Sequence, residues 1–259
     1  MARAMWKGVL QLGEEAIPVK LYAAVQERAV RFRMLQQRSR APIRQRMVDP
    51  EAEREVETAE IIKGYETEPG VFVVLDEQEL ESLEPKPSRD VTVARFVPRT
   101  AVPHAWFDRP YYLGPDGEEE AYFALARALA KQDRIGIVSW VMRKKEYAGA
   151  LLTHGAYLLL ITLRHAGEVV PASALPRPAG RKPDEREIAM ARQLVAALEA
   201  EFDLAAFHDE YRERVEELVR TKAKGGRIEL KKFEPKAATD SLGELLKASV
   251  KHARERRVA

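Results

Sequence analysis

IGIVSWV at residues 135–141 and YLLLITL at residues 157–163 are the stretches that decide the fold class. Both are short, aliphatic and uncharged, which is typical of strands buried on both faces, and VFVVL at residues 71–75 has the same character. Elsewhere apolar and polar residues alternate with a period of two, as at residues 17–21. The pattern predicts a β-rich α+β fold with a barrel as its core.

Two helices are expected to interrupt the strands. The first, residues 77–83, can be capped by Asp76, and Glu79 lies at the spacing of a capping box. The second, residues 118–131, begins with glutamates and ends with a lysine, an arrangement that suits the helix dipole.

The C-terminal third has a different composition. PASALPRPAGRKP at residues 171–183 is rich in proline and basic residues and predicts a linker. An apolar stripe from Ile188 to Phe202 predicts one helix beyond it, and Asp203 is expected to cap a second helix that stops at the glycine pair 225–226. The expected organisation is a core of residues 1–172, a linker of 173–186, a helical arm of 187–226 and a short basic tail of 227–259.

Composition limits the possible functions. The 259 residues are 46% hydrophobic, enough to bury a core, and there are no cysteines, which excludes disulfides, thiolate metal sites and cysteine nucleophiles. No apolar run is long enough to span a bilayer. We therefore expect a cytoplasmic protein that is not associated with a membrane.

The most informative local feature is a run of seven arginines between Glu27 and Asp49 that contains no acid. Guanidinium groups suit phosphate oxygens, so the run predicts a nucleic-acid contact in which Arg31 and Arg33 lie on an alternating strand that leads into a loop. A solvated strand face is the alternative, and the missing counter-charges argue against it. The predicted DNA-binding residues here are Arg31, Arg33, Arg38, Arg40, Arg44 and Arg46.

A second basic group follows two of the apolar strands. Arg143, Lys144 and Lys145 come directly after the first, and Arg164 closes the other. If these strand ends meet at one rim of a barrel, the four residues add to the DNA contact. Ordinary gatekeeper charges beside hydrophobic strands are an equally good explanation.

Enzyme signatures are weak. There is no glycine-rich phosphate loop, no His-Glu-x-x-His and no Gly-x-Ser-x-Gly, and the five histidines lack metal-ligand spacing. Pro183-Asp184 with Glu229-Leu230-Lys231 echoes a nuclease metal site, but nothing in the sequence places the two together. We expect no catalytic residue, no metal and no cofactor.

An ordered series of segments resembles the Ku family in its short bacterial form. It begins with Leu12-Gly13 and IPVKLY at 17–22, continues with KGYE at 63–66 and WFDRPYYLGP at 106–115, and ends with EIAMA at 187–191 and DEYR at 209–212. No single motif is decisive, but the order is specific. The resemblance covers about residues 6–226.

The resemblance implies a β-barrel core, a bridging segment and a helical C-terminal arm, with two copies encircling duplex DNA. It implies sequence-independent binding of double-stranded DNA ends in non-homologous end joining, recruitment of an ATP-dependent DNA ligase and no catalysis. A ring that slides must contact phosphate and sugar, which agrees with arginines that lack a base-reading helix.

The resemblance also places ligase recruitment near the C-terminal helices. One face of each helix must pack for the arm to fold, so the predicted partner-binding residues are exposed ones, Tyr211, Glu213 and Glu217. Two other functions stay open: an unrecognised metal-dependent end-processing nuclease, and a chromatin-type binder that depends on the basic tail.

Overall fold

A computed structural model describes residues 3–176 and 180–225. The chain divides into two compact units. One contains residues 3–28 and 33–174, and the other contains residues 29–32 together with the described residues from 175 onward. Each unit is described by itself.

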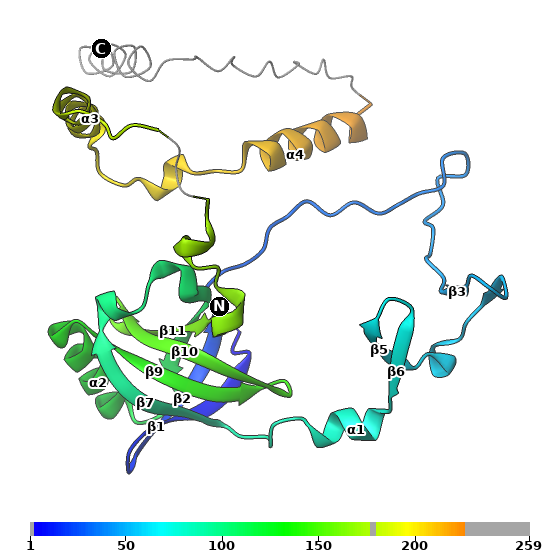
Figure 1. The fold of residues 1–259 in the computed structure, drawn as a ribbon, viewed down its shortest axis with the longest axis horizontal. Helices are drawn as coiled ribbons and strands as arrows, with labels where there is room; N and C mark the ends of the chain where they lie inside the picture. Colours follow the sequence, from blue (N-terminus) through cyan, green and yellow to red (C-terminus); the bar gives the residue numbers. More distant parts are fainter. Residues whose placement is uncertain (1–2, 177–179, 226–259) are drawn as a thin grey trace. The chain divides into compact units, whose positions relative to one another are not determined.

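Seven strands of the first unit close into a barrel, as the sequence predicts (Figure 1). They are β1 (Trp6–Leu12), β2 (Glu15–Ala23), β7 (Asp90–Pro98), β8 (Phe107–Pro115), β9 (Arg134–Met142), β10 (Lys145–His154) and β11 (Tyr157–Leu163). Their order around the barrel is β1-β2-β8-β11-β10-β9-β7. All neighbours are antiparallel except β1 and β7, whose parallel pairing closes the barrel.

Side chains of the two decisive stretches form much of the barrel core. In β11, Leu158 and Leu160 are fully buried, and the alternate residues Leu159, Ile161 and Leu163 are half-buried. β9 follows the same alternation, with Val138 and Trp140 inside. The expectation that these strands are covered on both faces therefore holds in part, because the outer faces are only half-buried.

Helix α2 (Glu119–Gln132) packs against β9, β10 and β11, close to its predicted bounds. Tyr122 fixes it to the barrel: its hydroxyl donates to the Leu113 carbonyl and accepts from the Leu158 amide at 2.8 Å. Leu113 and Leu158 face each other across β8 and β11. Burial of the phenol raises the pKa of Tyr122 above its ordinary value.

Residues 33–89, which lie between β2 and β7, are called the arm from here on, as distinct from the helical C-terminal segment. It contains β3 (Val48–Asp49), β4 (Arg54–Glu55), β5 (Lys63–Glu68), β6 (Val71–Leu75) and α1 (Glu77–Ser82). The predicted capping box of α1 is confirmed, since the Asp76 carboxylate accepts from the Glu79 amide at 2.7 Å. β3 with β4 and β5 with β6 form two separate two-stranded sheets.

Two predictions for this region are wrong. The apolar strand at residues 71–75 is exposed, because β6 pairs only with β5 and no second layer of the described chain covers it. Residues 31–33 form no strand, since no described segment pairs with them. The alternation of arginine and phenylalanine in this segment does not by itself provide a neighbouring strand with which its backbone can hydrogen-bond.

The second unit contains α3 (Glu185–Leu198) and α4 (Glu210–Ala223). The predicted cap of the last helix is wrong: Asp203 caps a short 3₁₀ turn, and Asp209 caps α4 by accepting from the Arg212 amide at 3.0 Å. Both aspartates are good caps, and the chain uses the later one for the longer helix. The predicted tail, residues 227–259, lies outside the described residues.

Within residues 3–176 and 180–225, no helix is both long and apolar enough to cross a membrane.

Candidate nucleic-acid interface

One rim of the barrel carries the arm. β2 ends there at Ala23 and β7 begins there at Asp90, so the chain leaves the barrel toward the arm and returns from it at the same rim. Antiparallel alternation also places the β9–β10 turn, the start of β8 and the end of β11 at this rim. The structure thus brings the predicted cluster at residues 143–145 and the predicted Arg164 to the same rim.

The β9–β10 turn consists of two basic residues in the left-handed region. Arg143 has φ 53° and Lys144 has φ 64°, values that a tight hairpin turn requires and that non-glycine residues adopt at a cost. The Lys144 ammonium lies 3.1 Å from a Glu84 carboxylate oxygen and 3.5 Å from one of Glu81. The hydrogen bond with Glu84 raises the pKa of Lys144. Acids of the arm therefore neutralise Lys144, while Arg143 makes no ion pair among the described residues.

Two cations that the sequence analysis missed lie beside this turn. Lys86 and Arg89 line, together with Arg143, a hollow of about 840 Å³ whose apolar wall includes Trp6 and Met142. Neither stood out in the sequence, because each lies in the proline-rich return of the arm among acids and serines. The strand register, which the sequence does not reveal, places them at the rim.

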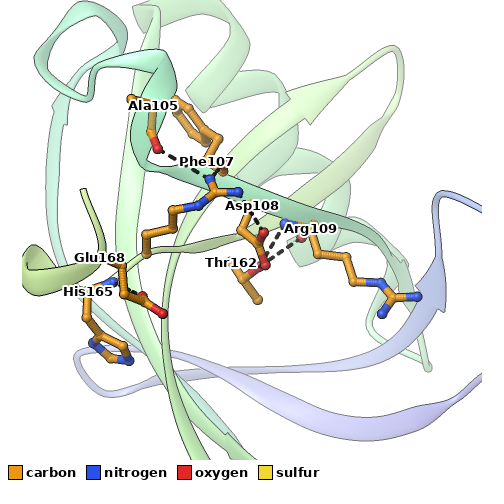
Figure 2. Close-up of polar contacts among 8 residues, drawn as sticks. Ala105, Phe107, Asp108, Arg109, Thr162, His165 and Glu168 are labelled. Carbon is orange, nitrogen blue, oxygen red and sulfur yellow. Dashed lines mark hydrogen bonds and ion pairs between the residues drawn. The ribbon is translucent and has the colours of Figure 1, made fainter. Parts of the chain in front are cut away.

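Arg164 is engaged within the barrel. Its guanidinium lies 2.9 Å from an Asp108 carboxylate oxygen and donates to the backbone carbonyls of Ala105, at 3.3 Å, and Phe107. Its own amide donates to the Trp106 carbonyl at 2.8 Å. Figure 2 shows the Ala105 and Phe107 carbonyls and the Asp108 carboxylate that the guanidinium contacts. The guanidinium thus holds the start of β8 in place, a use that the sequence does not reveal.

The arginine segment, residues 28–46, is exposed and mostly irregular. Gln36 and Ser39 shape a turn that places Arg40 at φ 57°, and the isolated pairing of Leu35 with Pro42 closes it. Arg46 is paired, with 2.6 Å between a guanidinium nitrogen and Glu55. Within the described chain no ion pair involves the other arginines of the segment, which are Arg28, Arg31, Arg33, Arg38, Arg40 and Arg44. Arg31 belongs to the second unit, and the others belong to the first.

Lys145, the remaining predicted contact, begins β10 and is exposed. It pairs across the hairpin with Met142 and makes no ion pair in the part of the chain that the structure describes. The role of every predicted DNA-binding residue stays a prediction.

The three predicted partner-binding residues lie on α4 and are exposed. Glu213 and Glu217 are four residues apart and share a helix face, whereas Tyr211 lies two residues before Glu213, on another face. The structure therefore brings together the two acids but not all three residues. Glu213 also lies 3.8 Å from His208.

No group of three or more metal-ligating side chains occurs among residues 3–176 and 180–225. Asp184, which belongs to the nuclease-like pattern noted in the sequence, caps α3 by accepting from the Glu187 amide at 2.9 Å. The Glu187 carboxylate hydrogen-bonds to Arg181, which lowers the pKa of Glu187 and raises the pKa of Arg181. The other residues of that pattern, 229–231, lie outside the described residues.

Comparison with known proteins identifies the family. A family model described as the Ku70/Ku80 beta-barrel domain matches residues 11–190. The chain belongs to the Ku family. The match includes six of the seven strands of the barrel in full, the arm and the first turn of α3.

Curated bacterial relatives extend the match across the whole chain. "Non-homologous end joining protein Ku" of Anaeromyxobacter sp. (strain K) is 39% identical, over 99% of this chain and 88% of the relative. The Symbiobacterium thermophilum protein of the same name is 35% identical, over 99% of this chain and 65% of the relative. "Non-homologous end joining protein Ku 2" of Geotalea uraniireducens (strain Rf4) is 33% identical, over 95% of this chain and 97% of the relative. The resemblance read from ordered segments is thereby confirmed.

Proposed function

We propose that this Ku-family protein binds double-stranded DNA ends without regard to sequence, as a homodimeric ring, in non-homologous end joining. The observation that carries the proposal is the arm. It begins with arginines that have no acidic partner among the described residues and continues into an apolar hairpin that the described chain leaves uncovered. The arginines call for an anionic partner, and the exposed apolar hairpin calls for a second protein surface to cover it.

The β5–β6 hairpin supports the dimer (Figure 1, cyan). Phe72 and Val74, on one face of β6, are 60% and 57% exposed, and Val71 and Val73, on the other face, are also exposed. An isolated two-stranded sheet is marginally stable in water, and large apolar groups exposed together are typical of an interface. A second copy supplies the same apolar strand and the same unpaired edges, so a symmetric pair of arms covers both.

The arginine segment supports contact with the DNA backbone. Guanidinium groups bind phosphate oxygens in pairs of hydrogen bonds, and phosphate contacts carry no base information. At the arm-bearing rim, Arg143 and Lys145 extend the predicted contacts of the arginine segment. Lys144 and Arg164, which were also predicted as contacts, lie at the same rim but are ion-paired. Such a surface binds all duplex sequences similarly and loses affinity steeply with salt.

Recruitment of an ATP-dependent DNA ligase is the second part of the proposal. The acids Glu213 and Glu217 offer a basic partner one charged helix face, and Tyr211 is 59% exposed. We assign catalysis to the ligase and none to this protein, which acts in the cytoplasm at the nucleoid.

Trapping the ring on DNA tests the proposal. The protein is loaded on linear duplex, the ends are joined by an added ligase, and the complex is washed at high salt. A ring stays on the circle that forms around it, whereas it leaves duplex that remained linear. Equal loss from both products would contradict encirclement.

A further inference from the structure

A β-bulge at the arm-bearing rim sets two side chains against one. β8 and β11 pair regularly up to Ile161, after which the register shifts. Two residues of β8, Asp108 and Arg109, then lie opposite Thr162 alone. Bulges of this kind bend a strand and redirect its side chains, and they often occur beside functional sites.

Thr162 holds the bulge from inside. Its side chain is buried, and residue 162 is 5% exposed. The hydroxyl oxygen accepts from the Arg109 amide at 2.9 Å and lies 3.3 Å from both the Arg109 carbonyl and a carboxylate oxygen of Asp108, to which it can donate (Figure 2). The Thr162 hydroxyl therefore accepts from the Arg109 amide, and its single hydrogen is shared between the Arg109 carbonyl and the Asp108 carboxylate.

The Asp108 carboxylate is neutralised on its other side by Arg164, at 2.9 Å. That leaves Arg109 as the exposed cation of the bulge. No ion pair or side-chain hydrogen bond involves its guanidinium within the described chain. Figure 2 shows its side chain extending away from Asp108 and Thr162. The network holds the backbone of an arginine and leaves its charged group exposed.

Arg109 lies near the point where the chain leaves β2 toward the arginine segment. β2 and β8 are neighbours, and their pairing ends with Ala23 opposite Tyr111. The chain that leaves β2 at this point therefore starts out beside the first residues of β8, where Arg109 is held. From there the sequence continues directly to Arg28 and the rest of the arginine segment.

We propose that Arg109 is a DNA-phosphate contact at the barrel rim, and that Thr162 and Arg164 are positioning residues that hold it there. This proposal rests on the proposed function. It gives Arg164, which the sequence nominates as a contact, a different role: its donors are used on Ala105, Phe107 and Asp108.

The first test compares Arg109→Ala with Arg134→Ala in binding of a short linear duplex across a salt series. Arg134 is also an exposed arginine of the barrel, but it begins β9, at the opposite rim. Arg109→Ala lowers the slope of log affinity against log salt by about one per subunit, and Arg134→Ala leaves the slope unchanged. If wild type binds ends and Arg109→Ala retains the full slope, the Arg109 proposal fails and the proposed function stands. If wild type shows no preference for ends, the proposed function itself fails.

A double variant separates positioning from contact. If Arg164 acts through Arg109, Arg109→Ala/Arg164→Ala has the same salt slope as Arg109→Ala. A salt slope lower by about one more per subunit would show that Arg164 contacts phosphate itself and would overturn its positioning role. Thermal unfolding of each variant reports whether the barrel is intact.

If Arg164→Ala does not fold, Thr162 provides the same comparison. Thr162→Ser keeps the hydroxyl and retains the wild-type slope. Thr162→Val removes the hydroxyl at nearly the same volume and shifts the slope toward that of Arg109→Ala. Equal slopes for Ser and Val at residue 162 would overturn the positioning role of Thr162.

Discussion

The apolar runs of strands β9 and β6 resemble each other in sequence and differ in surroundings. Residues 135–141 of β9 (IGIVSWV) and β6 (VFVVL) are both uncharged and apolar, yet Val138 and Trp140 are buried and Phe72 and Val74 are exposed. β9 lies between two strands of a closed barrel, whereas β6 has one neighbour. An apolar run thus needs cover, but the run itself does not say whether its own chain or a second copy supplies it.

Breaking the exposed hairpin should have the largest effect. Phe72→Asp/Val74→Asp puts two charges where the proposed partner strand packs, so we expect a monomer, with affinity for DNA ends at least about 100-fold lower, or about 2.7 kcal/mol. Light scattering after gel filtration gives the oligomeric state, and a duplex-binding titration gives the affinity. The barrel should keep its unfolding temperature, since neither residue belongs to its core.

Ala52→Asp/Ala59→Asp is the matched control, because it adds the same charge at exposed positions of the arm outside β5 and β6. The control should remain a dimer. A Phe72→Asp/Val74→Asp protein that stays dimeric would place the interface elsewhere.

Removing four arginines from the arm should have the next largest effect. In Arg38→Ala/Arg40→Ala/Arg44→Ala/Arg46→Ala, each lost phosphate contact lowers the salt slope by about 0.9, for a total of about three to four per subunit. Affinity should fall equally for duplexes of unrelated sequence, since no base contact is lost. Arg46 should contribute least, because Glu55 pairs with it. An unchanged slope would remove this cluster from the interface.

In the barrel, Tyr122→Phe should lower the free energy of unfolding by about 1–3 kcal/mol, because it leaves the buried Leu113 carbonyl and Leu158 amide without a partner. Chemical denaturation measures this change. Affinity of the folded fraction for DNA should stay unchanged. Tyr157→Phe is the control: Tyr157 is exposed and its hydroxyl makes no hydrogen bond within the described chain, so its effect should be within about 0.5 kcal/mol.

The smallest expected effect concerns pH. Hydrogen bonds from Lys20 and Lys7 lower the pKa of Asp116, and the bond with Asp116 raises the pKa of Lys20. A carboxyl with a lowered folded pKa contributes stability above its ordinary pKa, and this stability is lost as pH falls through the folded value. Thermal unfolding of Asp116→Asn should therefore be less pH-dependent than wild type in that acidic range. Because both side chains are still partly exposed to solvent, the difference should be small, and identical profiles would show that the pair contributes nothing.

Much of the barrel could be predicted from local patterns. The alternation of β2, the apolar runs of β9 and β11 and the capping box of α1 are local properties, and all are present in the structure. The cap of the last helix was misplaced because Asp203 and Asp209 are equally good caps in sequence, and Asp203 caps a shorter turn.

Features that depend on register could not be predicted. Arg164 ends an apolar strand and was nominated as a phosphate contact, but the pairing of β8 with β11 brings Asp108 and two carbonyls within its reach. Arg109 lies in a segment with an adjacent acid and attracted no notice, yet the bulge leaves it exposed. Whether a cationic side chain is exposed or ion-paired depends on which residues of the neighbouring strand lie beside it. A one-residue shift in register changes those residues.

A competition between DNA topologies tests the central claim most directly. A labelled short linear duplex bound to the protein is challenged, across a salt series, with linear or covalently closed circular DNA of one sequence. A ring that loads through ends is displaced by the linear competitor only. Equal competition by circles would contradict threading, and the protein would then be a general DNA binder.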